Sequence, residues 1–142
     1  MAKFTIQDNS ITTLKPHEIF VFGSNLSGAH GKGAAKYALQ KFGAIYGRGI
    51  GFVGGQSYGI PTVKQKINGC LSGKCTIDDI CYYINKVFYF DVLANQQLNF
   101  LVTKVGCGLA GYSDAQIAPL FSNFLQFDNV EFPVEWEHLL SG

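Results

Sequence analysis

A glycine-rich segment between residues 23 and 35 holds the residue types that most plainly indicate chemistry. It reads Gly-Ser-Asn-Leu-Ser-Gly-Ala-His-Gly-Lys-Gly-Ala-Ala and follows an apolar run at 19–22. An amphipathic stretch with helical spacing comes next, at 33–42. Glycines at the junction of a buried strand and a helix let backbone N–H groups converge on an anion. The segment therefore predicts a phosphate-binding loop.

A second glycine loop, residues 106–112, has the same context. It reads Gly-Cys-Gly-Leu-Ala-Gly-Tyr, follows an apolar run at 100–105, and precedes another helical stretch. Ser113 and Gln116 have the spacing of a capping box, which fixes where that helix begins. Ligands of open α/β folds bind beyond the carboxyl ends of the strands. If the two apolar strands are neighbours, the loops face each other, both helix starts direct positive ends between them, and a diphosphate fits there.

Composition favours one domain that covers residues 1–142. The chain has 142 residues, enough for one core and too few for two ordinary domains. With 47% hydrophobic and 15% charged residues it is not disordered, and a net charge of +1 gives no strong nucleic-acid signal. Apolar runs are too short to span a membrane, and the N-terminus lacks a signal-peptide pattern. We therefore expect a soluble, cytoplasmic protein without a membrane partner.

The four cysteines, Cys70, Cys75, Cys81 and Cys107, do not have the spacing of common zinc sites. We expect reduced thiols, no metal and no cofactor. Cys107 differs from the others because it lies in a glycine loop at a helix start. That setting lowers the pKa of a thiol and makes Cys107 a candidate nucleophile. No histidine or acid close in the sequence supports that role.

Strands and helices alternate around the two loops. The pattern predicts strands at 4–6, 19–22, 57–60, 100–105 and 130–132, and helices at 33–42, from Thr76 and from Ser113. Residues 43–55 are glycine-rich and irregular. Pro61 is expected to end the predicted strand at 57–60, and residues 62–74 are expected to form a loop. The alternation predicts a single α/β domain of three layers, with helices on both faces of a mixed sheet.

The order of these pieces resembles the macrodomain family, whose α/β modules bind ADP-ribose. The family pattern has three parts. Its V-N-A-A-N segment is similar to residues 21–25, its glycine run is similar to the glycines that follow, and its G-A-I-H-R-A-A-G segment is similar to residues 33–43. The family loop S-T-G-I-Y-G-Y is similar to residues 106–112. Over residues 17–136 the chain is still more similar to a macrodomain-like branch often encoded by phages or prophages. That branch carries F-V-F-G-S-N-L-x-G, H-G-x-G-A-A, Q-S-Y-x-I-P-T and G-C-G-L-A-G-Y, all present here in order.

This resemblance implies a macrodomain-like fold and two functions of different classes. One is a module that binds ADP-ribose or a related NAD-derived nucleotide, cyclic forms included. In a phage setting such a module sequesters a signal in the host cytoplasm. The alternative is a hydrolase that removes ADP-ribose from protein or nucleic acid, or processes an ADP-ribose derivative, with Asn25 and His30 as catalytic candidates. A third interpretation is an interaction protein on the same scaffold. The loops show no obvious acid–base pair, which favours the binding module.

Three positions bear on this choice. Hydrolytic macrodomains often carry an acid or a second asparagine in the first loop, where this chain has Phe22 and Lys32. Ala110 stands where the family usually has an aromatic residue near the distal ribose. Asn25 aligns with the second asparagine of the family motif, which contacts that ribose. An Asx turn or a helix-entry cap explains Asn25 equally well.

Five charged or titratable residues each have a functional and a structural interpretation. His30 can hydrogen-bond a phosphate or ribose, act as a general acid, or simply lie in water. Lys32, Arg48 and Lys64 can neutralise phosphate or be solvated surface charges. By the resemblance, Asp8 can hydrogen-bond an adenine amino group, as an aspartate near the first strand does in macrodomains.

The remaining candidates lie on the pocket wall and in the second loop. Gln56 and Ser57 line the wall or start a strand. Tyr112 stacks on a base or sugar, or packs with Ile117 as a hydrophobic staple. Asp114 complements the helix dipole. The full set of predicted ligand-binding residues is Gly23, Ser24, Asn25, His30, Gly31, Gly33, Ala34, Gln56, Ser57, Gly106, Cys107, Gly108, Leu109, Ala110, Gly111 and Tyr112.

The helix that begins near Thr76 carries more aromatic surface than one buried stripe needs. The surplus residues are Tyr82, Tyr83, Tyr89 and Phe90. They indicate either a helix buried on two sides or a homodimer contact.

Overall fold

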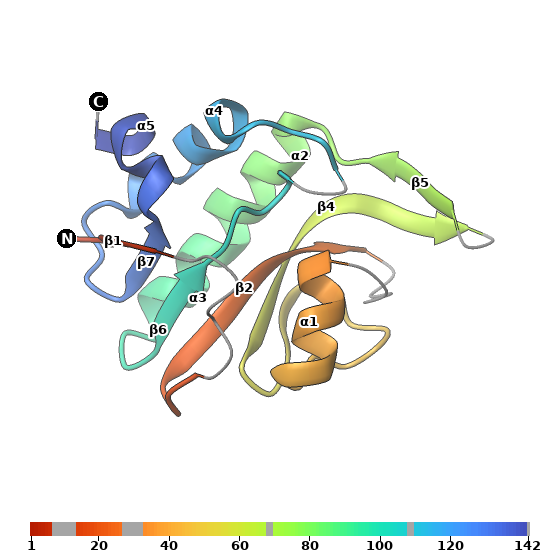
Figure 1. Cartoon of the computed structure of the whole chain (residues 1–142), viewed down its shortest axis with the longest axis horizontal. Helices are drawn as coiled ribbons and strands as arrows, with labels where there is room; N and C mark the ends of the chain where they lie inside the picture. Colours follow the sequence, from red (N-terminus) through yellow and green to blue (C-terminus); the bar gives the residue numbers. More distant parts are fainter. Residues whose placement is uncertain (7–13, 27–32, 68–69, 108–109, 142) are drawn as a thin grey trace.

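The computed structural model describes residues 1–6, 14–26, 33–67, 70–107 and 110–141, which form a seven-stranded mixed sheet with helices on both faces (Figure 1). The strands follow the order β1-β7-β6-β2-β4-β3, and β5 pairs with β4 outside this path. Their bounds are β1 Lys3–Thr5, β2 Glu18–Asn25, β3 Gly51–Gly54, β4 Ser57–Ile67, β5 Cys70–Lys74, β6 Asn99–Val102 and β7 Val130–Pro133. The predicted single α/β domain is confirmed.

All pairs from β1 to β4 along this order are parallel, whereas β3 and β5 run antiparallel to β4. The α-helices are α1 Gly33–Lys41, α2 Ile77–Tyr82, α3 Tyr89–Ala94, α4 Asp114–Ile117 and α5 Glu137–Ser141. A π-helix, η1 Tyr83–Phe88, joins α2 to α3, and two 3-10 helices are η2 Ala118–Phe124 and η3 Val134–Trp136.

Side chains of β2 point alternately to the two faces of the sheet, and each face has its own hydrophobic core. Ile19 and Val21 belong to the larger core, under the long helix and the C-terminal helices. Phe20 and Phe22 point to the opposite face and pack with Ala35 and Ala38 of α1 and with Phe42 just after it. Successive residues of a strand face opposite sides, so a strand that is apolar throughout needs a cover on both. This is the predicted three-layer arrangement.

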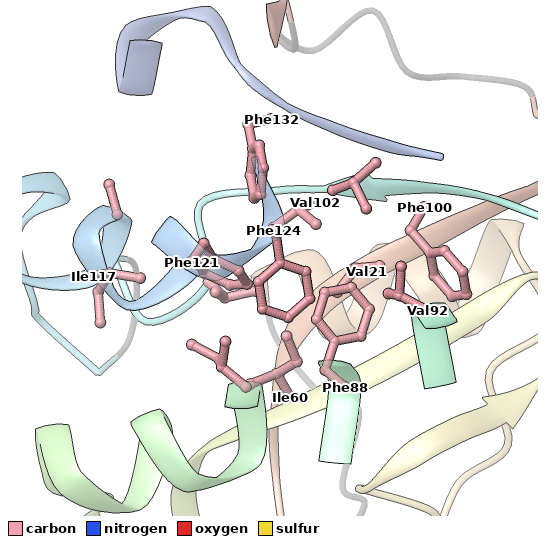
Figure 2. Packing of buried hydrophobic residues seen from close by; sticks show 14 of the residues in the cluster. Val21, Ile60, Phe88, Val92, Phe100, Val102, Ile117, Phe121, Phe124 and Phe132 are labelled. Carbon is pink, nitrogen blue, oxygen red and sulfur yellow. The ribbon is translucent and has the colours of Figure 1, made fainter. Parts of the chain in front are cut away.

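The larger core is a cluster of aromatic rings around Phe88 (Figure 2). The Phe88 ring lies 5.0 Å from the ring of Tyr58, 5.5 Å from Phe100 and 5.2 Å from Phe124, between centroids. The Tyr58 hydroxyl donates a hydrogen bond to Asp91 on α3, and burial raises the pKa of Tyr58 above its ordinary value. The long helix is therefore fixed to the central strand β4 by packing and by one polar contact.

The long helix begins where the sequence predicts. Thr76 caps α2, and Asp79 completes a capping box, because each side chain accepts a hydrogen bond from the other residue's backbone N–H. Of the surplus aromatic residues, Tyr83 and Tyr89 pack against the larger core, while Tyr82 and Phe90 are each 56% exposed. A homodimer contact stays a prediction for those two. No helix among the described residues has the length and apolar character needed to cross a membrane.

Two predictions between residues 43 and 74 are wrong. The glycine-rich stretch contains the edge strand β3, and the expected loop after Pro61 is a hairpin made of the second half of β4 and β5. Pro61 lies inside β4, beside a register shift in the pairing with β2 directly after Ser24. Proline is tolerated at such an irregularity because one ladder hydrogen bond is already missing there.

Candidate functional site

The two glycine loops meet at one edge of the sheet. β2 and β6 are parallel neighbours, in register from the pair Glu18–Asn99 to Val21–Val102. β6 ends at Val102, beside Val21, and β2 continues to Asn25, so the second loop sequence begins alongside the last part of β2 (Figure 1). A Cβ atom added to Gly23 of β2 would lie 3.2 Å from the backbone nitrogen of Gly106. The predicted adjacency of the two strands is thus present, and the last part of β2 lies close to the start of the second loop.

Thr62 of β4 forms a third side of this contact and was not predicted. Its side chain is 4% exposed, and its hydroxyl donates to the backbone oxygen of Ser24 at 3.4 Å. That hydroxyl would lie 3.2 Å from a Cβ on Gly23, and the Thr62 methyl 3.5 Å from a Cβ on Gly106. Thr62 ends the Q-S-Y-x-I-P-T motif. The motif was the available signal, but the prediction that Pro61 ends the strand left Thr62 in a loop.

The first loop sequence begins inside the strand. Ser24 and Asn25 are buried residues at the end of β2. The Ser24 hydroxyl donates to the backbone oxygen of Gly49, which brings the segment around Arg48 to the same edge of the sheet. Arg48 itself is exposed and makes no ion pair among the described residues. The Ser24 hydrogen bond therefore places the backbone next to Arg48 at this end of β2.

The second loop is closed at its base by backbone hydrogen bonds. The backbone N–H of Tyr112 donates to the backbone oxygen of Gly106 at 2.9 Å, and the backbone N–H of Cys107 donates to the backbone oxygen of Lys104 at 3.2 Å. Gly106 has φ +78°, a conformation that strains any residue with a side chain, and a Cβ there would lie 3.1 Å from Ile117. Ala110 is buried at the far side of the loop. The loop's ends are thus held in one conformation before any ligand arrives.

Tyr112 has a structural role in this arrangement. Its hydroxyl donates to the backbone oxygen of Cys75, and its ring packs against the larger core together with the buried Ile117. The side chain therefore fixes the loop to the start of the long helix. This agrees with the staple interpretation and leaves stacking on a ligand as a prediction.

The helix after the second loop begins at the predicted position. The Ser113–Gln116 capping box is present, and α4, with 4 residues, continues directly into the 7-residue 3-10 helix η2. The free N–H groups of the first turn carry the partial positive charge of a helix start. α1, with 9 residues, follows the first loop sequence. That both helix starts direct their positive ends at one ligand stays a prediction.

Cys107 is not an activated nucleophile. Burial, together with a hydrogen bond to Asp114 and the negative charge of Asp114, raises the pKa of its thiol to about 12, against the opposing charge of Lys104. At neutral pH the group is therefore a protonated thiol. The interpretation that the loop setting lowers this pKa is contradicted, since Asp114 lies beside the sulfur.

Gln56 and Ser57 lie at the wrong end of β4 for the predicted site. Ser57 pairs with Phe20, whereas the partner of Gly23 is Ile60, about 10 Å further along the strand. The Gln56 amide donates to the backbone oxygens of Lys15 at 2.7 Å and Glu18 at 2.9 Å. The Ser57 hydroxyl donates to the backbone oxygen of Phe42 at 2.9 Å. Both side chains join elements at the amino end of the sheet, so they do not meet the glycine loops.

Other predicted residues have less definite places. Gly33 begins α1, Ala34 is exposed in its first turn, and Gly111 is exposed with φ +79°. Lys64 is exposed on β4, beyond Thr62. Asp8, His30, Gly31, Lys32, Gly108 and Leu109 lie outside the described residues. Among the residues that are described, no group of three histidine, cysteine, aspartate or glutamate side chains could hold a metal ion.

Comparison with known proteins adds information about the fold alone. No protein-family model matches the chain, and no curated protein matches it. Among solved structures it is similar to a protein of unknown function from Bacteroides thetaiotaomicron, with a TM-score of 0.66 and 15% identity over 94% of this chain and 97% of that one. The likeness covers nearly the full length of both chains, so the whole α/β arrangement is shared.

Proposed function

We propose that this protein binds ADP-ribose or a related NAD-derived nucleotide at the edge where its two glycine loops meet. The observation that carries the proposal is the close approach of Gly23, near the carboxyl end of β2, to Gly106, which follows the parallel neighbour β6. Open α/β sheets bind their ligands at this edge. The family resemblance of the two loop sequences supplies the ligand class.

A diphosphate suits this edge for a physical reason. Gly23 and Gly106 have no side chains, so the two backbone segments approach each other closely, with the Thr62 side chain against both. Backbone N–H groups donate well to phosphate oxygens, and two loops offer donors from two directions. Arg48 precedes the Gly49 carbonyl that accepts from Ser24, and its guanidinium can add a positive charge. Binding would thus rest on shape and hydrogen bonding, with little dependence on net charge.

The titratable groups described in the loops favour binding over hydrolysis. Asp114 accepts hydrogen bonds from Trp136 at 3.0 Å and from Lys104 at 3.4 Å, so its carboxylate is already engaged. Cys107 is a protonated thiol. General acid–base catalysis needs a group free to exchange a proton with the substrate. Neither of these two residues meets that requirement, and the hydrolase alternative depends on His30.

Isothermal titration calorimetry with ADP-ribose and with cyclic ADP-ribose isomers tests the proposal. Heat that saturates with one of these ligands is the expected result. Mass spectrometry of the ligand after long incubation then separates the two classes, because a binding module returns it unchanged and a hydrolase does not. An absence of heat with all of them at millimolar ligand would overturn the proposal.

Asn25→Ala is expected to weaken ADP-ribose binding by about 1–3 kcal/mol, if the buried side chain at the end of β2 donates to the ribose. The matched control is Asn129→Ala, which removes a half-buried asparagine that donates to Val92 and Asn95, away from the loops. Calorimetry should show a loss for Asn25→Ala alone. Equal affinity in both variants would assign Asn25 to the structure of its own loop.

Arg48→Ala is expected to weaken binding of ADP-ribose about five- to tenfold, with a smaller loss at high salt, because an exposed charge is screened. Lys41→Ala is the control, since it removes the same charge from the exposed carboxyl end of α1, at the opposite edge of the sheet. Titrations at two salt concentrations measure the difference. A similar loss in both variants would mean that only net charge matters.

A further inference from the structure

Asp114 receives hydrogen bonds from two side chains that come from different parts of the chain. Its Oδ1 accepts from the indole Nε1–H of Trp136 at 3.0 Å, and its Oδ2 accepts from Nζ of Lys104 at 3.4 Å. The Cys107 thiol donates to the backbone oxygen of Val105 at 3.7 Å and lies close enough to Asp114 for the carboxylate to raise the pKa of the thiol. The Asp114 carboxylate therefore joins the segment before the second loop to the buried Trp136.

These partners enclose the second glycine loop. Lys104 and Cys107 stand at its entry and Asp114 just beyond its exit, so the carboxylate ties the two ends of the loop together. Trp136 is fully buried between β7 and α5, with its ring 5.7 Å from that of Phe121. The indole therefore anchors the carboxylate to the larger core. The loop's ends cannot shift independently without breaking at least one of these contacts.

We propose that Asp114 is a positioning residue of the second glycine loop: it joins Lys104, before the loop, to Trp136 in the larger core, and so fixes the backbone of Gly106 and Cys107 and of residues 110–112 for contact with the phosphates of the ligand. The inference rests on the proposed function for its ligand. Its structural part, the fixing of the loop and of the Cys107 thiol, stands without one.

Electrostatics agree with this role. Burial raises the pKa of Asp114, but hydrogen bonds from Trp136 and Cys107 and the charge of Lys104 outweigh it, so the pKa lies below its ordinary value. The carboxylate is therefore charged at neutral pH, and it disfavours a second negative charge on Cys107.

The simpler role, complementing the dipole of α4, makes a different prediction. A first-turn acid needs no side-chain partners to complement a helix dipole. Asp78, in the first turn of α2, is such an acid, exposed to solvent. Asp78→Asn is therefore the matched control for Asp114→Asn.

The experiment measures alkylation of Cys107 by iodoacetamide, mapped by mass spectrometry between pH 7 and 10, together with hydrogen exchange of the peptide that covers residues 104–113. Asp114→Asn should speed alkylation of Cys107 at least about fivefold at pH 8.5, because one pKa unit is tenfold in thiolate. It should also speed exchange in the loop peptide. Asp78→Asn should change neither. Unchanged alkylation and exchange in Asp114→Asn would overturn the proposal.

A second variant tests the direction in which the neighbouring charges shift the pKa of Cys107. Lys104 lowers the pKa of Cys107, so Lys104→Met should slow alkylation while it loosens the loop. General unfolding would instead speed alkylation in both variants. If the wild type binds ADP-ribose, Asp114→Asn should weaken that binding about tenfold, and an unchanged affinity would contradict the positioning role. If the wild type binds no ADP-ribose, the proposed function fails, and alkylation and exchange still decide the role of Asp114.

Discussion

Replacing Gly23 by valine is expected to reduce the affinity for ADP-ribose more than about a hundredfold, because losing two hydrogen bonds to charged phosphate oxygens costs about 3 kcal/mol or more. The new Cβ would lie 3.2 Å from the backbone nitrogen of Gly106 and 3.2 Å from the Thr62 hydroxyl, and the valine methyl groups extend further. The second loop would have to move away from β2. The backbone at Gly23 has no positive φ, so the effect comes from lost space and not from strain.

The measurement combines calorimetry with the stability of the variant. Overpacking of this kind costs about 1–3 kcal/mol in the free energy of unfolding, so the protein should remain folded. Val53→Ala is the control, because it removes buried volume from the smaller core, away from the loops, at a similar cost. Gly23→Val should lose binding and Val53→Ala should keep it.

Hydrogen exchange gives a readout that needs no ligand. In Gly23→Val the peptide over residues 104–113 should exchange faster than in the wild type, whereas in Val53→Ala it should not. Full affinity and an unchanged exchange pattern in Gly23→Val would show that the contact between Gly23 and Gly106 is not part of the site.

The meeting of the two loops was predictable because it depends on strongly apolar strands. Runs such as 19–22 are buried on both faces, and the capping box at Ser113 marks the turn from loop to helix. Such signals place a loop at the carboxyl end of a strand. That β2 and β6 are adjacent is decided by topology, and the sequence left it as a condition.

The hairpin of β4 and β5 differs from the prediction because proline does not always end a strand. Proline was expected to end a strand, yet the register shift after Ser24 lets β4 continue through Pro61. The Asn68–Gly69 dipeptide between the two strands is the sequence signal that favours a hairpin, and it was overlooked. Because residues 62–74 were predicted as a loop, Thr62 was not among the predicted site residues.

The role of Asp114 could not be predicted because its partners are distant in the sequence. Trp136 lies 22 residues away, and their contact depends on how η3 packs beside α4. The effect on Cys107 follows from that contact, since a carboxylate held beside a half-buried sulfur raises its pKa whatever the loop sequence. Local spacing gives the candidate groups, and tertiary packing decides their ionisation.

Phe88→Ala is expected to lower the free energy of unfolding by about 3–5 kcal/mol, the usual cost of a large cavity in an aromatic core. Phe88 is fully buried, and its ring lies 5.2 Å from Phe124 and 5.0 Å from Tyr58. Urea unfolding should show the loss, and the melting temperature should fall by about 10 °C or more.

Phe52→Ala is the control that separates burial from ring contact. The Phe52 ring also lies 5.0 Å from the ring of Tyr58 and 6.1 Å from that of Phe100, between centroids. Phe52 is 41% exposed, however, so water can fill the space that its removal leaves and no buried cavity forms. The expected cost is about 1 kcal/mol or less. Equal losses in the two variants would contradict the cavity argument. Below its melting transition Phe88→Ala should keep the affinity for ADP-ribose that Gly23→Val loses, because the loops are held by backbone contacts and by Asp114, not by the Phe88 ring.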